Sequence, residues 1–343
     1  MKKMLFIAAV ASVALASCTN DENTFEGVKN GREVSFVAAD YANQSRSEHD
    51  FSLAFSNANY MVWAWFNGGN VPFINELTVN ANGTYAGPYY WPDEALDFAA
   101  VSPAGDPRIT VSRDASGATT VTYEFDGDNE NTTTTNLMHA DFVVGQTKAT
   151  PTVALGFRHA LAKLNVVLHQ NAVAAGSLPT GVSGYEVVLQ NVRINNILCQ
   201  GTLTVTANDQ NTTDRVWNAS SPAATTNWNI LTSANQPIKA ADYATAINYY
   251  VMPQTLADAT TITIDYDVIS TLTSGGTSKL AKSATVKLND IYKSGSSTEK
   301  ITDWFTNKVI TYTFNINPTA ELTPIAFTAQ EEEWGTVGGS HTF

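Results

Sequence analysis

The sequence has 343 residues, of which 43% are hydrophobic, and a formal net charge of −13 at pH 7. This length allows about two domains, each large enough to bury a hydrophobic core. The acidic balance argues against nucleic acid as a partner and against electrostatic attachment to anionic lipid, because both of these surfaces attract basic side chains.

The first 17 residues have the pattern of a secretory signal peptide. Lys2 and Lys3 precede an apolar run from Leu5 to Ala16, which is too short to span a bilayer. Cys18 follows directly after Leu-Ala-Ser, a sequence that resembles a bacterial lipobox. The resemblance implies cleavage before Cys18, lipidation of this residue and stable anchoring by several acyl chains. An ordinary secreted protein is the alternative.

Residues 18–32 are polar and predict a flexible tether. Asp21 and Glu22 lie just after the cysteine, where acidic residues resemble the signal that exports lipoproteins of Bacteroidota to the outer face of the outer membrane. The expected location is therefore the cell surface, although a generic solvated linker would have the same composition. Cys199 is the second of two cysteines in the sequence and lies in an apolar segment, so we expect a buried thiol and no disulfide framework.

The rest of the chain predicts an all-β fold. Apolar and polar residues alternate in several runs, among them Val121–Phe125, Ile262–Val268 and Ile310–Ile316, and turn residues rich in glycine separate the runs. Alternation with a period of two gives a strand one buried face and one wetter face. The run Tyr60–Phe66 is apolar throughout and predicts a strand that is buried on both faces.

We expect two antiparallel β-sandwich domains of similar size. The N-terminal one spans residues 33–170 and the C-terminal one residues 185–343. Between them lies a stretch of Ala, Gly, Ser and Pro without alternation, which we interpret as a soft domain boundary.

No motif in the sequence predicts catalysis. The five histidines lack metal-ligand spacing, and there is no nucleophile elbow, phosphate loop or dinucleotide fingerprint. We therefore expect no enzyme, no catalytic residue, no metal and no cofactor. Two alternatives stay open. Dispersed carboxylates of a glycoside hydrolase meet only in the fold. Stacking surfaces for a glycan are offered by Trp63, Trp65, Tyr89, Tyr90 and Trp91, although we expect core or interface packing of these aromatic side chains.

Five short sequence motifs occur in a characteristic order: Tyr89–Pro92 with Leu96–Pro103, Ala140–Gly145, Val153–Leu164, Tyr250–Leu256 and Tyr312–Ile316. Behind a lipobox, this order resembles the fimbrillin-like lipoproteins of Bacteroidota, the subunits of type V pili. The resemblance covers nearly all of the chain after the leader. It implies two transthyretin-like β-sandwich domains, in agreement with the strand pattern.

The resemblance also implies assembly by strand exchange. An arginine-specific protease cuts near the N-terminus and releases the first strand, and the C-terminal segment of a neighbouring subunit fills the opened groove. Here the expected first strand is Glu33–Tyr41, followed by Arg46 in a polar stretch, so we expect cleavage between Arg46 and Ser47. Arg32 precedes the strand, and a cut there would leave the groove closed.

The expected donor strand lies near the C-terminus. The residues at alternate positions, Ile325, Phe327 and Ala329, would lie on one face of a strand and could enter a groove at a sheet edge. The acidic run Glu331–Glu333 interrupts this alternation. An ordinary last strand is the alternative.

Together these features predict a structural or accessory pilus subunit that supports adhesion. Its expected partners are other pilus subunits, the outer membrane, the protease and a host or bacterial receptor; the alternative is a non-polymerising, glycan-binding surface lipoprotein.

Overall fold

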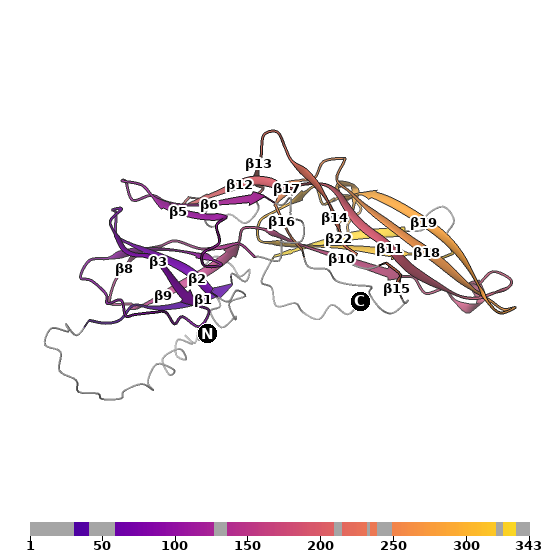
Figure 1. Cartoon of the computed structure of the whole chain (residues 1–343), viewed down its shortest axis with the longest axis horizontal. Coiled ribbons are helices and arrows are strands. Elements are labelled where there is room, and N and C mark those ends of the chain that lie inside the picture. The colour runs from indigo at the N-terminus through magenta and orange to yellow at the C-terminus, as the bar shows by residue number, and fades with distance from the viewer. Residues whose placement is uncertain are drawn as a thin grey trace, which may run out of the picture.

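The computed structural model describes residues 31–40, 59–126, 136–208, 215–231, 234–238, 249–319 and 325–333. This part of the chain is nearly all β, which confirms the predicted fold class, with short 3-10 helices at Ala175–Ser177 and Leu288–Asp290. None of the helices in these ranges has the length and hydrophobicity needed to cross a membrane. The strands form an elongated molecule, with an N-terminal part on the left of Figure 1 and a C-terminal part on the right.

The N-terminal part is built on a seven-stranded sheet. Its strands are β1 (Ser35–Asp40), β2 (Asn59–Phe66), β3 (Pro72–Asn80), β4 (Leu96–Ser102), β7 (Met138–Ala140), β8 (Val143–Gln146) and β9 (Thr152–His159). The order is β1-β9-β7-β4-β2-β3, and β8 pairs with β4. β1 is therefore an edge strand, and it runs parallel to β9 while the other pairs of this sheet are antiparallel.

The central strands of this sheet are buried on both faces, as the apolar run of β2 predicts. Tyr60 and Val62 belong to one hydrophobic core, whereas Trp63 and Trp65 belong to a second core on the opposite face. All four side chains are at most 7% exposed. A strand with two buried faces needs apolar residues at successive positions, because successive side chains point to opposite sides of the sheet.

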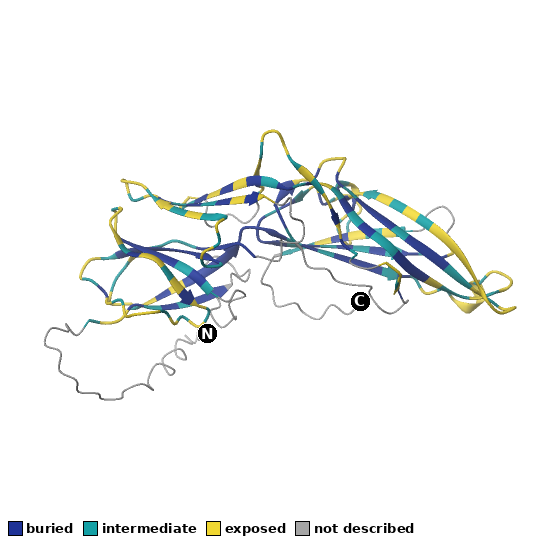
Figure 2. Cartoon of the chain, viewed as in Figure 1, coloured by how far each residue is buried: buried dark blue, intermediate teal, exposed yellow. Residues whose placement is uncertain are grey.

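A four-stranded sheet covers the second face. It consists of β5 (Ile109–Arg113), β6 (Thr119–Asp126), β12 (Gln200–Thr206) and β13 (Asn218–Ala219), in the order β13-β12-β6-β5. Tyr123 and Leu203 of this sheet pack in the same core as Trp63 and Trp65. In Figure 1 this layer lies above the seven-stranded sheet, and Figure 2 shows that strands of both layers contain buried residues.

The C-terminal part is a sandwich of two further sheets. One contains β10 (Ala162–Gln170), β16 (Tyr249–Val251), β21 (Lys308–Ile316) and β22 (Ile325–Glu333). The other contains β11 (Val182–Leu198), β14 (Thr225–Asn229), β15 (Gln236–Ile238), β18 (Thr261–Leu272) and β19 (Thr277–Lys287). A third core fills the space between them, and β17 (Gln254–Thr255) pairs separately with β20 (Asp303–Trp304).

The strand pairing does not follow the division that the sequence suggests between residues 170 and 185. β10 lies before this stretch but pairs in parallel with β21, and β12 lies after it but pairs with β6. β11 leads into β12 through the buried Cys199, with register shifts along β11 and Asn196 at a φ of 54°. Such irregularities bend a strand, so one length of chain serves both parts of the molecule.

Candidate functional site: the first and last strands

The first strand is part of the N-terminal core. Val34, Phe36 and Ala38 point inward and are 1%, 6% and 8% exposed. The ring of Phe36 makes edge contacts with Tyr85 and Phe98, at centroid distances of 5.6 and 6.1 Å. Alternation in the sequence thus gives β1 one fully buried face, as expected.

The backbone of the first strand is held from two sides. On one side, Ser35–Asp40 pairs with β9 over its whole length. On the other side, the Val34 amide donates to the Tyr89 carbonyl at 2.8 Å, and the Tyr85 hydroxyl donates to the Val34 carbonyl. We call these surroundings, made by β9, Tyr85, Tyr89 and Phe98, the β1 site.

Gly83 lets the chain approach β1 closely. Its φ is +84°, and a Cβ at this position would lie 2.3 Å from the carbonyl oxygen of Phe36. Any other residue would therefore clash with the backbone of β1, in addition to adopting an unfavourable conformation. The Asn-Gly pair at residues 82–83 predicts a turn. The sequence does not predict that this turn lies against the first strand.

The predicted processing residues lie outside the described part of the chain. This holds for Cys18, for Arg46 and Ser47, and for the leader, residues 1–17. The chain order nevertheless places Arg46 after β1, which ends at Asp40, and before β2, which begins at Asn59. A cut after Arg46 would thus separate the chain segment of β1 from the segments that form the β1 site.

The predicted donor residues lie on the last described strand. β22 pairs antiparallel with β21 over all nine of its residues, with Phe327 opposite Phe314. Ile325 and Phe327 are partly buried against the C-terminal core, and Ala329 is 1% exposed. The alternation is as expected, but the strand continues through Glu331–Glu333, because an edge strand can expose charged side chains without losing its backbone pairing.

β22 is at the edge of its sheet. On its other side, the Ala329 amide donates to the Tyr292 carbonyl at 3.0 Å and the Ala329 carbonyl accepts from the Ser294 amide at 2.6 Å. Glu331 also forms an ion pair of 3.6 Å with Lys293. The structure thus places the predicted donor strand in its own domain and brings neither Ile325 nor Phe327 to the β1 site, whose strand is in a different sheet.

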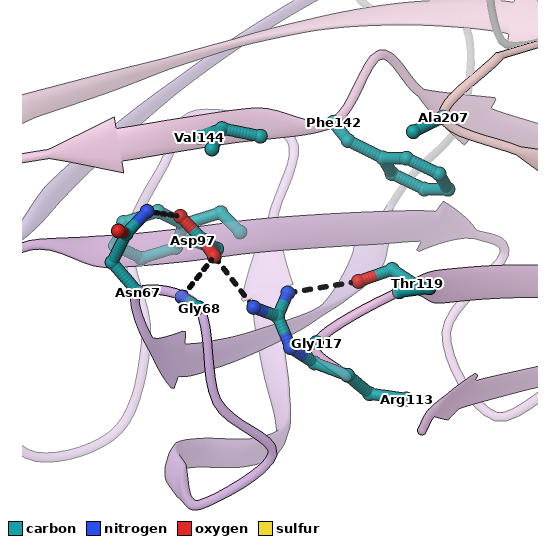
Figure 3. Close-up of a pocket in the computed structure, with 11 residues that line it drawn as sticks. Asn67, Gly68, Asp97, Arg113, Gly117, Thr119, Phe142, Val144 and Ala207 are labelled. Carbon is teal, nitrogen blue, oxygen red and sulfur yellow. Dashed lines mark hydrogen bonds and ion pairs between the residues drawn. The ribbon is translucent and has the colours of Figure 1, made fainter. Parts of the chain in front are cut away.

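A pocket of about 220 Å³ lies between β4 and β5 (Figure 3). The carboxylate of Asp97 accepts hydrogen bonds from the Asn67 side chain at 2.6 Å and from the amides of Gly68 and Gly145 at 3.3 and 2.8 Å. It also forms an ion pair of 2.5 Å with Arg113, and the two side chains are 6% and 4% exposed. Burial by itself would raise the pKa of Asp97, but these hydrogen bonds outweigh it and lower the pKa.

Arg113 is likewise occupied by protein partners. It donates to the Gly69 carbonyl at 2.6 Å and to the Thr119 hydroxyl at 2.9 Å, and it lies 5.1 Å from the ring of Trp65. Because the polar groups of the pocket floor bind one another, we interpret Asp97 and Arg113 as a clamp between the two N-terminal sheets. The sequence gives no signal for this pair, whose members meet only in the fold.

The tryptophans are buried wherever the structure describes them: Trp63, Trp65, Trp91, Trp217, Trp228 and Trp304. Burial removes Trp63, Trp65 and Trp91 as stacking surfaces for a glycan, whereas Tyr89 is partly buried and Tyr90 is 44% exposed. Within the described ranges, no group of three or more His, Cys, Asp or Glu residues is arranged to hold a metal ion.

A family model described as fimbrillin-like matches residues 54–334. The chain belongs to the fimbrillin-like family. No curated protein matches the sequence of this fimbrillin-like protein.

Among solved structures, a fimbrial protein from Bacteroides vulgatus is similar, with 19% identity and a TM-score of 0.56 over 88% of this chain and 100% of the other. A candidate cell adhesion protein from Bacteroides uniformis is 16% identical, with a TM-score of 0.46 over 89% of this chain and 98% of the other. The first likeness supports the fold, and the family match places this chain among fimbrillin-like proteins.

Proposed function

We propose that this fimbrillin-like protein is a structural or accessory subunit of a surface pilus, assembled by strand exchange and supporting adhesion. One observation carries the proposal. β1 is a buried edge strand whose site is formed entirely by residues that follow Arg46 in the chain. Cleavage after Arg46 therefore turns an internal strand into a separate and replaceable one.

Release of β1 would leave the β1 site open to water. Val34 and Phe36 are nearly fully buried, and burying a large apolar side chain contributes about 1.5–3 kcal/mol. The edge of β9 would also lose its backbone pairing with β1. An open apolar site beside an unpaired strand edge favours the entry of another strand. Burial of the apolar site and renewed backbone pairing would then drive polymerisation.

β22 is suited to act as the entering strand. As an edge strand it can leave its sheet while β21 stays paired with β10. Phe327 is only partly buried against its own core, whereas Phe36 in the β1 site is 6% exposed. Transfer into such a site would bury the aromatic ring more completely, which offsets part of the loss of pairing with β21.

Export precedes assembly in this proposal. The leader directs secretion, and lipid on Cys18 anchors the precursor in the outer membrane, facing the cell exterior. An arginine-specific protease at the surface then separates the anchored segment, with β1, from the remaining chain. The processed subunit joins other pilus subunits in the fimbrium, where it contacts a host or bacterial receptor.

The test uses purified chain 19–343, which lacks Cys18 and hence the lipid. Treatment with an arginine-specific protease should yield a product that begins at Ser47, identified by N-terminal sequencing, and filaments visible by electron microscopy. Arg46→Lys is the matched control, because it keeps the charge but is not a substrate for the protease. Arg32→Lys should polymerise like the wild type.

Two results would contradict the proposal. One is a stable product that begins at Glu33 and retains β1. The other is cleavage at Arg46 with complete loss of β1 but no filaments at high protein concentration.

A further inference from the structure

The inward-facing side chains of β1 and β22 form the same series. Each segment presents an aliphatic, then an aromatic, then a small residue at alternate positions: Val34, just before β1, with Phe36 and Ala38 in β1, and Ile325, Phe327 and Ala329 in β22. The outward positions between them hold small or β-branched residues in both strands: Ser35 and Val37, and Ala326 and Thr328. The two segments therefore match over five consecutive residues, read in the same chain direction.

We infer that the strand entering the β1 site is β22 of a second copy of this chain, parallel to β9, with Phe327 at the place of Phe36. The inference rests on the proposed strand exchange and adds the partner, the direction and the register. Because one chain carries both the site and its matching strand, the polymer consists of identical subunits.

Side-chain size favours the parallel direction. An antiparallel strand centred on Phe327 would place Ile325 where Ala38 lies, and Ala329 where Val34 lies. Ala38 is 8% exposed, so its surroundings leave little room for three more carbon atoms, while the Val34 position would be underfilled. Overpacking and cavities both destabilise a core, and the parallel register limits the mismatch to the one extra carbon of Ile325 at the Val34 position.

The backbone of the β1 site also accepts the proline that precedes β22. In the parallel register, Pro324 takes the position of Glu33, which forms a bridge with Tyr90. The two hydrogen bonds of this bridge use the amides of Val34 and Trp91, so the Glu33 amide takes no part in it. Proline lacks an amide hydrogen and fits a position where none is required.

The match ends after the fifth residue. Ala39 follows in β1 and is 1% exposed, whereas Gln330 follows in β22 and is exposed. The register is therefore defined by the segments from Val34 to Ala38 and from Ile325 to Ala329.

Paired cysteines test the register. In β1, Ser35 lies opposite Thr152 with their hydroxyls 2.9 Å apart, and Val37 lies opposite Ala154. The parallel register places Thr328 opposite Ala154, so the variant Ala154→Cys/Thr328→Cys should form disulfides between subunits. The control is Ala154→Cys/Ala326→Cys, which the antiparallel direction would join. All three substituted side chains are exposed, so both variants should fold.

The variants are made in chain 19–343, where the buried Cys199 is the single native cysteine. After protease treatment, filaments are oxidised and separated on a non-reducing gel. Facing residues of neighbouring strands lie about 5 Å apart, within disulfide range, whereas diagonal ones lie about 7–8 Å apart and beyond it. We expect a ladder of linked subunits for the first variant, absent from the control and abolished by reductant.

Each outcome is decisive. A ladder in the control variant, or filaments of the first variant without a ladder, overturns the register but leaves strand exchange standing. The cleaved wild-type chain could form no filaments alone but form them with another pilus subunit. This result would overturn the inference that the entering strand comes from a second copy of this chain. Failure of the wild type under both conditions overturns the proposed function together with the inference.

Discussion

At the scale of single residues, Asp97 and Arg113 show how polar groups organise the N-terminal part. Their ion pair is almost fully buried and joins β4 to β5. Loss of one member of such a pair leaves the other charge buried without compensation, which costs about 3–5 kcal/mol. By contrast, Asp93 and Lys148 form an ion pair of 2.7 Å whose side chains are 93% and 58% exposed.

We therefore predict that Asp97→Asn lowers the free energy of unfolding by about 3 kcal/mol at pH 7, measured by urea denaturation. Asp93→Asn is the control and should cost under about 1 kcal/mol, because exposed pairs contribute little. Equal effects of the two substitutions would contradict the clamp.

The difference between wild type and Asp97→Asn should depend on pH. The pKa of Asp97 is lowered in the folded protein from its ordinary value of 3.8. A lowered pKa stabilises the fold above 3.8, and this contribution is lost as the pH falls through the folded-state pKa. The difference in unfolding free energy between wild type and Asp97→Asn should thus be largest at pH 7 and become smaller in acid. A difference that grows in acid would contradict a lowered pKa of Asp97 in the folded protein.

At the scale of elements, β22 has two faces with separate roles. Ile325 and Phe327 face the core, whereas Ala326 and Thr328 face solvent. In the proposed polymer the inward face fills the β1 site and the outward face stays at the surface. A charge on one face should therefore block assembly, while a charge on the other face should not.

We predict that Phe327→Asp abolishes filaments after cleavage, because it would bury a charge in the β1 site. The monomer should stay folded but lose about 1–3 kcal/mol, since Phe327 is partly buried against its own core. Thr328→Asp is the matched control and should polymerise. Filament counts and thermal melting are measured together, and filaments of Phe327→Asp at wild-type yield would exclude β22 as the donor.

At the scale of the whole molecule, separate cores confine the effect of losing β1. Val34, Phe36 and Ala38 pack only in the core on the outer face of the seven-stranded sheet, whereas β11 and β18 surround the C-terminal core. Proteins open locally in cooperative units, so damage to one core need not spread to the other. The N-terminal part can thus lose a strand while the part that carries β22 remains intact.

Hydrogen exchange can test this confinement. After cleavage of the Phe327→Asp variant of chain 19–343, which should not polymerise, and removal of β1, amides of β9 should exchange about tenfold faster or more, because their pairing with β1 is gone and no donor strand replaces it. Amides of β18 should keep their protection. The measurement compares Phe327→Asp with Phe327→Asp/Arg46→Lys after the same protease treatment. Faster exchange throughout β18 would mean that β1 supports the whole fold and is not a replaceable strand.

The local pattern of the sequence determined the class of fold and the character of individual strands. Alternation predicted the inward faces of β1 and β22, and the apolar run predicted a β2 buried on both faces, because these depend only on where successive side chains of a strand point. The resemblance of short motifs to fimbrillin-like proteins agrees with the family match. Neither depends on knowing which strands are neighbours.

The tertiary structure decided the partners of each strand. Residues 152–157 lie beside β1, β12 completes a sheet with β6, and Asp97 meets Arg113, although nothing near these residues in the sequence marks the contact. Strand pairing is selected by the packing of cores between distant segments, whereas alternation records only that a strand has a buried side. For the same reason, the fit of β22 to the β1 site emerges only once the residues that surround β1 are known.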